Sequence, residues 1–302
     1  MSKKNRIEQD SIGKIAVSNE DFWGAQTQRS LKNFKIGNHI MPIEIIRALA
    51  IIKLSCAKVN SKQKILSNKL SAAIVGASKL VLSGKYDRHF PLSVWQTGSG
   101  TQTNMNVNEV IANLANKKLT GKLGTNSPVH PNDHVNKSQS TNDSFPSAIN
   151  IATAILVKDS LIPSMKRLQT TLKSHSKKWD KIIKVGRTHL QDATPLSLGQ
   201  EFSGYEAMIS SNIKRVEQSF NSLLNLAQGG TAVGSGLNTK KNFDKFVVNE
   251  ISKISKIKFK PAINKFQALA AHDAIVEISG SLNVLTTDLF KIANDIRLLG
   301  SG

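Results

Sequence analysis

The stretch AHDAIVEISGSLNVLTTDLFKIANDIRLL, residues 271–299, decides the fold. Its apolar side chains recur in alternating steps of three and four: Ala271, Ile275, Ile278, Leu282, Leu285, Leu289, Ile292, Ile296 and Leu299. This spacing, which we call the α-seam, extends over about four heptads and predicts a long helix packed against other helices. We expect that helix to cover residues 266–299. Thirty residues of helix extend about 45 Å.

Helical spacing recurs along most of the rest of the chain. Two more long helices are expected at 143–178 and 196–227, and shorter ones after Pro42, at 68–82 and at 105–119. Residues 1–40 are expected to be irregular, with short extended pieces at 14–17 and 182–185. We therefore predict a mainly α fold. It has a smaller N-terminal domain over 1–138 and a long-helix bundle over 139–302.

The α-seam helix is apolar on more than one side. Ala274 and Leu298 add a second apolar line beside the α-seam. A monomeric bundle core would explain part of this pattern. Long helices with so wide an apolar surface more often pack with partner chains, so we expect an oligomer.

Composition narrows the function classes. The 302 residues carry a net charge of +20, but the lysines are scattered and aromatic residues make up only 5% of the chain, which disfavours a nucleic-acid-binding surface. No apolar run approaches the roughly 18 residues needed to span a bilayer. The single Cys56 allows no internal disulfide and indicates a reducing compartment, so we expect a cytoplasmic protein that acts neither on membranes nor on nucleic acid.

Several common kinds of site are disfavoured by spacing. His130 and His134 are four apart, but Pro131 between them disfavours a helix and no cysteine lies nearby, so no metal site is expected. The glycine-rich segment 229–236 lacks the Gly-Lys-Ser/Thr ending of a phosphate loop. A turn that offers backbone N–H groups to an anion and a plain helix connection both remain open for it.

Three polar blocks interrupt the helical pattern and favour acid–base chemistry. They are GSGTQTN (98–104), SQSTND (138–143) and GRTHLQD (186–192). Thr188 lies beside His189, whose imidazole is suited to proton transfer, and Asp192 or another acid could orient that ring. Neutral donors that could hold a carboxylate without a metal come from separate segments: Thr101, Asn104, Asn106, Asn132, Ser140, Thr141 and Asn142.

The chain closely resembles class II fumarate hydratase, within the fumarase/aspartase superfamily. The matching blocks run through nearly the whole chain in one order: WGAQTQR (23–29), GSGTQTNMNVNE (98–109), HPND (130–133), SQSTND (138–143), GRTHLQD (186–192), GGTAVG (229–234) and NKF (264–266). The resemblance implies an L-aspartase-like long-helix bundle. It also implies a homotetramer whose active sites each take segments from three subunits.

The resemblance further implies reversible, cofactor-free hydration of fumarate to (S)-malate through a carbanion. His189 matches the group that handles the proton of the water or hydroxyl. Substrate-binding positions are matched by Ser99, Gly100, Thr101, Ser140, Thr141, Asn142 and Thr188. A second carboxylate-binding site is matched by His130, Pro131, Asn132 and Asp133.

Two departures from the family pattern modify this expectation. The sequence ends at Gly302, before the part where the family carries a mobile Gly-Ser-Ser loop, a Lys, an Asn and a Glu. We therefore expect a fragment with little activity alone, because its carbon-acid base would be missing. Gln267 also stands where the family more often has Glu.

Two other functions compete with the fumarate hydratase interpretation. An aspartate ammonia-lyase shares the fold, although its pattern usually carries Gln at the position of His189. A non-catalytic helical assembly subunit would keep the polar blocks without using them.

Overall fold

The computed structural model describes residues 5–301, which form two compact units. The first unit combines the residues up to Ala152 with Leu224–His272, and the second combines Thr153–Leu223 with the residues from Asp273 onward. The chain leaves the first unit within a helix, so no turn-rich linker marks the change. The domain boundary that we predict near residue 138 lies inside the first unit. The division into a domain of residues 1–138 and a domain of residues 139–302 stays a prediction.

The first unit begins with a β-hairpin. Strand β1 (Asn5–Asp10) pairs antiparallel with β2 (Gly13–Ser18), so the prediction of an irregular segment over residues 1–40 was wrong. The extended piece predicted at 14–17 is confirmed within β2. The β1 sequence NRIEQD lacks the apolar alternation typical of a strand, so its pairing depends on tertiary contacts that the sequence pattern does not show.

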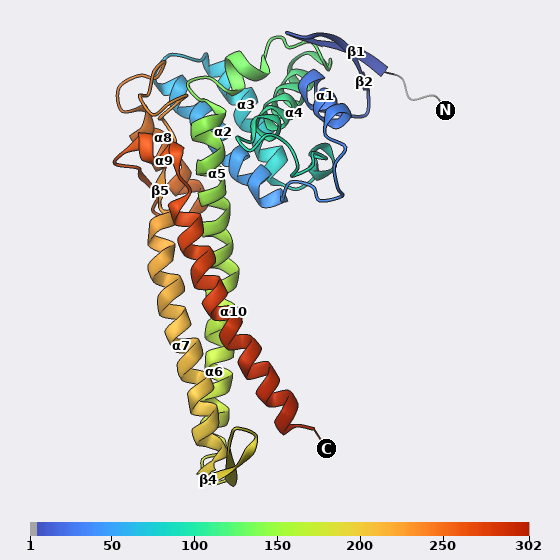
Figure 1. Ribbon diagram of the computed structural model, residues 1–302. Helices are drawn as coiled ribbons and strands as arrows, with labels where there is room; N and C mark the ends of the chain where they lie inside the picture. The colour runs from blue at the N-terminus through green and yellow to red at the C-terminus, as the bar shows by residue number, and fades with distance from the viewer. Residues whose placement is uncertain (1–4, 302) are drawn as a thin grey trace. The chain divides into compact units, whose positions relative to one another are not determined.

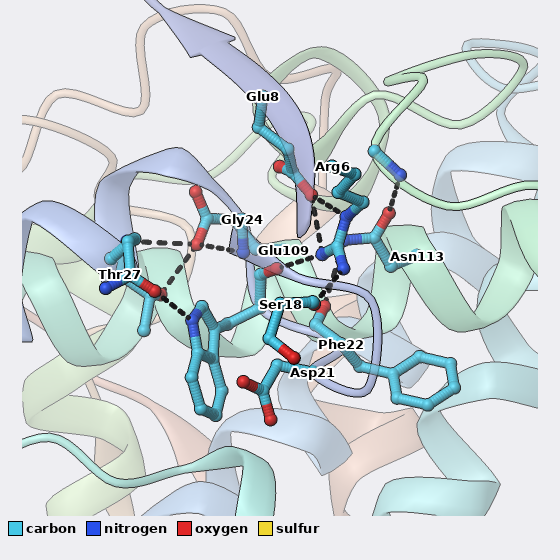
Figure 2. Close-up of polar contacts among 12 residues, drawn as sticks. Arg6, Glu8, Ser18, Asp21, Phe22, Gly24, Thr27, Glu109 and Asn113 are labelled. Atoms are coloured by element: carbon cyan, nitrogen blue, oxygen red, sulfur yellow. Dashed lines mark hydrogen bonds and ion pairs between the residues drawn. The ribbon is translucent and has the colours of Figure 1, made fainter. Parts of the chain in front are cut away.

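Helix α1 (Ala25–Asn33) is attached to α4 (Thr101–Thr120) through one buried carboxylate (Figure 2). Glu109 accepts hydrogen bonds from the backbone N–H groups of Gly24 (2.9 Å), Gln26 (2.8 Å) and Thr27 (3.1 Å). It also accepts one from the Thr27 hydroxyl (2.6 Å). Burial raises the pKa of Glu109 to about 7, although these hydrogen bonds act in the opposite direction.

Arg6 joins the N-terminal hairpin to the same region (Figure 2). Its guanidinium donates to Glu8 Oε1 at 2.7 Å, to the Ser18 carbonyl at 2.5 Å and to the Trp23 carbonyl at 2.7 Å. Burial raises the pKa of Glu8, with Arg6 opposing the shift. These contacts order a segment whose sequence carries little apolar pattern.

Three helices form the core of the first unit: α2 (Ile43–Lys62), α3 (Asn68–Leu82) and α4 (Thr101–Thr120). The predicted bounds of α3 are confirmed, and Ser67 caps its N-terminus by accepting from the Leu70 N–H. Helix α4 begins four residues before its predicted start, because its polar first turn offers no apolar periodicity. Core side chains include Ile46, Leu49, Ile52, Cys56, Ile74, Val107 and Ile111.

The rest of the first unit consists of short elements and two longer helices. Helix α5 covers Thr141–Leu156, and α8 (Phe243–Ser255) packs on α2. The short elements are the 3-10 turn η1 (Asp87–His89), the π-helical turn η2 (Pro131–Val135), the paired strands β5 (Asn225–Leu226) and β6 (Lys260–Pro261), and helix α9 (Lys265–Ala270).

The second unit consists of long helices and one hairpin. Helix α7 (Leu198–Leu223) packs against both α6 (Ile162–Lys178) and α10 (Asp273–Leu299) (Figure 1). The unit also contains the π-helical turn η3 (Val157–Leu161), β3 (Ile183–Thr188) and β4 (Gln191–Ser197). The long helices predicted at 143–178 and near 196–227 are thus confirmed with small changes of bounds.

The predicted helix 266–299 is interrupted. Ala271 is extended, with φ −134° and ψ 150°, and separates α9 from α10. Within α10 the α-seam is only partly buried. Ile278, Leu285 and Ile292, seven residues apart, are buried within the second unit, whereas Leu289 is 37% exposed. Other apolar side chains of α10 are exposed within the second unit: Val276, Val284, Phe290, Ile296, Leu298 and Leu299.

Among the described residues, one helical stretch, Thr141–Lys178, meets the length and composition of a membrane span. Its most apolar window has a mean hydropathy of 1.3, and 39% of that window is buried inside the protein. The core helix of a globular protein meets the same criteria. The buried carboxylate of Asp143 is unusual in a lipid-facing segment.

Candidate functional site

The first polar block forms the start of α4. Gly100 is the N-cap residue in a left-handed conformation, with φ 73°. A Cβ at this position would lie 2.4 Å from the Phe145 ring. Glycine is therefore required both by the positive φ of the backbone and by the close approach of that ring. The hydroxyl groups of Ser99 and Thr101 lie 3.0 Å apart and are exposed. They form a small donor pair at the helix N-terminus.

The second polar block forms the start of α5 and contacts the first. Thr141 Oγ1 accepts a hydrogen bond from Asn104 Nδ2 at 2.9 Å. Ser140 Oγ accepts from the Asn142 N–H at 3.2 Å, and the Asn142 side chain donates to the Ala232 carbonyl at 2.8 Å. The structure therefore brings the starts of α4 and α5 together, as hydrogen-bonding groups in a shared site would require.

Asp143 connects this site to the glycine-rich segment. Its completely buried carboxylate accepts from the N–H groups of Ser140 (2.9 Å), Gly229 (2.9 Å) and Thr231 (3.0 Å). Burial raises the pKa of Asp143 to about 6. Two backbone N–H groups of segment 229–236 are thus directed at this internal carboxylate, which favours a structural connection over an anion-binding loop for that part of the segment.

Lys53 is a residue that the sequence analysis missed. Its side chain is completely buried, and its ammonium group donates to Asn136 Oδ1 at 2.7 Å and to Gln139 Oε1 at 3.0 Å. Burial lowers the pKa of Lys53 to about 8. A lone lysine within the apolar run of α2 was an available signal, because lysine is rarely buried without partners.

The residues predicted to form the second carboxylate-binding site, 130–133, lie at the turn η2. His130 caps this turn: its Nδ1 accepts from the N–H groups of Asn132 (3.3 Å) and Asp133 (3.1 Å). The His130 N–H donates to His134 Nδ1 at 2.8 Å. Pro131 is buried, whereas the other two members of the predicted set, Asn132 and Asp133, are exposed.

The His130 turn is joined to the other blocks through Asn136. Asn136 Oδ1 accepts from Lys53 and, at 3.4 Å, from Asn104 Nδ2. Residues 5–301 contain no cluster of three or more His, Cys, Asp or Glu side chains placed to hold a metal ion.

Thr188 and His189 lie in the second unit, at the tip of the β3–β4 hairpin. Thr188 pairs with Gln191, so His189 and Leu190 are the two turn residues, with φ 51° and 61°. Turns of this kind usually contain Asn-Gly, because both positions need positive φ. Thr188 and His189 are exposed. A strained turn that presents an exposed imidazole is typical of a functional position.

One predicted orienting partner of His189 makes a different contact. Asp192 Oδ1 accepts from Arg187 at 2.8 Å across the hairpin. The suggestion that Asp192 or another acid orients the imidazole stays a prediction. The pair of Asp192 and Arg187 joins the two strands next to the turn, where both side chains are exposed.

Comparisons with known proteins agree with this architecture. Fumarate hydratase class II of Rickettsia conorii is 57% identical over 300 residues, which is 99% of this chain and 65% of that protein. The mitochondrial fumarate hydratase of Saccharomyces cerevisiae is 54% identical over 304 residues, which is all of this chain and 62% of the yeast protein. These similarities confirm the resemblance that the sequence blocks predicted.

The fold comparison gives the same result. The crystal structure of class II fumarase from Schistosoma mansoni has a TM-score of 0.97 and 43% sequence identity, and covers 99% of this chain and 66% of that one. The predicted mainly α, L-aspartase-like fold is thereby confirmed. This chain spans 65% of the length of the Rickettsia relative. A family model described as "Lyase" matches residues 13–302, and the chain therefore belongs to the lyase family.

Proposed function

We propose that this chain carries the diacid-binding part of a fumarate hydratase, which hydrates fumarate reversibly to (S)-malate without a cofactor. One observation carries the proposal: Asn104 donates to Thr141, and so joins the two hydroxyl-rich helix starts into one group of neutral donors. Such donors suit the carboxylates of a small diacid. The similarity to class II fumarate hydratases supports the choice of fumarate over other diacids.

The proposed roles follow from the resemblance to class II fumarate hydratases and agree with the chemistry of the side chains. His189 transfers the proton of the water or hydroxyl, and Thr188 holds the ligand beside it. Substrate carboxylates are bound by hydroxyl, amide and backbone donors of Ser99, Gly100, Thr101, Ser140, Thr141 and Asn142. The turn of His130, Pro131, Asn132 and Asp133, in which Asn132 and Asp133 are exposed, forms a second carboxylate site.

We also propose that the protein assembles as a homotetramer whose active sites are shared between subunits. The exposed apolar side chains of α10 support this, since Val276 and Phe290 are each 71% exposed. The proposed location is the cytoplasm, where the free thiol of the buried Cys56 would stay reduced.

Ligand binding and turnover test the function separately. We expect fumarate and (S)-malate, each at about 100 times its dissociation constant, to stabilise this chain by about 2.7 kcal/mol. The measurement is thermal unfolding with and without ligand. His189→Gln is the catalytic variant, and Leu190→Gln is its matched control at the same turn. Formation of fumarate from malate, which we expect to be slow for this chain and which is followed at 240 nm, should be lost only in the first.

The competing functions give different results in the same experiments. If aspartate stabilises the chain against thermal unfolding and ammonia is released from it, the function is that of an ammonia-lyase and not of a hydratase. No stabilisation by any diacid would reject a binding site and favour a helical assembly subunit. Turnover that is unchanged in His189→Gln would reject the role of that imidazole.

A further inference from the structure

The Lys53 ammonium group faces only oxygen acceptors in its two hydrogen bonds. Its donors reach Asn136 Oδ1 at 2.7 Å and Gln139 Oε1 at 3.0 Å. An ammonium group has three donors and no acceptor, so each amide must turn its oxygen rather than its NH₂ group toward it. The buried charge favours this orientation of both amides. Backbone carbonyls favour it too, since Gln139 Nε2 donates to the carbonyls of Val135 and Lys137 at 3.1 Å each, whereas Asn136 Nδ2 has only a 3.5 Å contact with the Gln139 carbonyl. The charge therefore matters most for Asn136.

The orientation of the Asn136 amide in turn affects the proposed substrate site. Because Asn136 presents Oδ1, the neighbouring Asn104 approaches it with Nδ2, at 3.4 Å. The same Nδ2 donates to Thr141 Oγ1 at 2.9 Å. A hydroxyl has a single hydrogen, and the Thr141 oxygen already accepts from Asn104, so the Thr141 hydrogen points elsewhere.

We propose that Lys53 is a positioning residue of the diacid site: its charge sets the direction of a hydrogen-bond relay through Asn136 and Asn104 that makes Thr141 a donor to a substrate carboxylate. This inference rests on the proposed function. Without the charge, the side-chain amides of Asn136 and Asn104 could turn over, and Asn104 Oδ1 would then accept from Thr141. The hydroxyl would donate to the protein instead of the ligand.

The charges around Lys53 favour its protonated form at neutral pH. The titratable groups that face it are Asp143 on α5 and Cys56 on its own helix, α2. Asp143 attracts the ammonium, and burial raises the pKa of the Cys56 thiol above its usual range, so the thiol stays neutral. Burial lowers the pKa of Lys53 to about 8, so the direction of the relay should weaken above that pH.

A ligand-free measurement tests the relay itself. In protein labelled with ¹⁵N at asparagine, the Asn104 side-chain amide should exchange with solvent roughly tenfold faster in Lys53→Gln than in the wild type. Lys58→Gln is the control on the same helix, since Lys58 pairs with Glu250 and is more exposed. Unchanged Asn104 exchange in Lys53→Gln would overturn the proposal whatever the substrate is.

A double-mutant cycle tests the effect on the ligand. Fumarate affinity, measured by calorimetry, should fall roughly tenfold in Lys53→Gln and in Thr141→Val, as expected for loss of one hydrogen bond to a charged group. The double variant should bind no more weakly than Thr141→Val, because both changes remove the same donor. Additive losses would overturn the proposal.

Two further outcomes keep the test decisive. If Lys53→Gln does not fold, as judged by circular dichroism, the wild type is titrated instead: its fumarate affinity should fall above pH 8, whereas that of Thr141→Val should not. A parallel fall in both proteins would contradict the relay. Absence of fumarate binding by the wild type would reject the proposed function, and the amide exchange alone would then decide the role of Lys53.

Discussion

At the scale of single residues, the first unit keeps several ionisable groups away from water. Glu109, Asp143 and Lys53 are almost completely buried, and each is held by hydrogen bonds of defined direction. Burial shifts the pKa of both carboxyls upward and that of the lysine downward, toward neutrality in each case. Their protonation should therefore influence stability at moderate pH.

Glu109→Gln is predicted to destabilise the protein by about 1–3 kcal/mol at pH 5, because the new NH₂ group would face backbone donors. The folded-state pKa of Glu109 is raised to about 7 from 4.5. Its contribution to stability is therefore fully present below pH 4.5 and is lost as the pH rises through 7. The destabilisation should be smaller at pH 8.

Urea unfolding at pH 5 and pH 8 measures this difference. Glu44→Gln, on the partly exposed first turn of α2, is the control and should change little at either pH. A larger effect of Glu109→Gln at pH 8 than at pH 5 would show that the four hydrogen bonds outweigh burial.

Residue chemistry explains which parts of the site the sequence could predict. The hydroxyl and amide blocks were visible because they interrupt helical periodicity, and the structure joins two of them through Asn104. The role of Lys53 was missed because its partners Asn136 and Gln139 lie 83 and 86 residues away in the sequence and come beside it only in the folded chain. The orienting role suggested for Asp192 stays a prediction. Its ion pair with Arg187 could not be predicted from the sequence, because the two residues come opposite each other only once the hairpin forms.

At the scale of elements, the β3–β4 hairpin is closed by an unfavourable turn. His189 and Leu190 both have positive φ, in the region that ordinary residues avoid. Leu190 is 78% exposed, so burial of its side chain within this chain does not offset that strain. The turn is therefore retained for something other than stability.

Leu190→Gly is predicted to stabilise the second unit by roughly 0.5–1 kcal/mol. Relief of a left-handed leucine contributes roughly 1–2 kcal/mol, and the greater unfolded-state entropy of glycine offsets about half of that. Thermal unfolding is the measurement. Ile183→Gly, at an exposed position of β3 in the same hairpin, should instead destabilise it, and equal effects of the two variants would contradict the strain argument.

Helix prediction succeeded where apolar periodicity was strong. The bounds of α3 agree because Ser67 caps its start and the apolar pattern ends at Leu82. The start of α4 was missed because its first turn is polar. The break at Ala271 was missed because the α-seam runs through it without proline or glycine, so only the extended backbone at that residue reveals it.

At the scale of the whole molecule, the exposed apolar surface of α10 is the main feature that this chain alone does not explain. Phe290→Ser is predicted to weaken self-association at least tenfold, because burying a phenylalanine contributes roughly 1.5–3 kcal/mol. Light scattering after size-exclusion chromatography measures it. Phe246→Ser, at an exposed position of α8 in the first unit, is the control, and equal dissociation by both variants would reject a specific role for α10.

The first unit is formed from two separate parts of the chain, and this affects its folding during synthesis on the ribosome. Asp143 finds its partner Gly229 only 86 residues later. A ribosome that adds about 5–20 residues per second needs roughly 4–17 s to cover that distance. During those seconds the helices between the two residues are synthesised, and the Asp143 carboxylate lacks the backbone donors of Gly229 and Thr231. Slow codons placed after residue 152 would prolong this vulnerable interval.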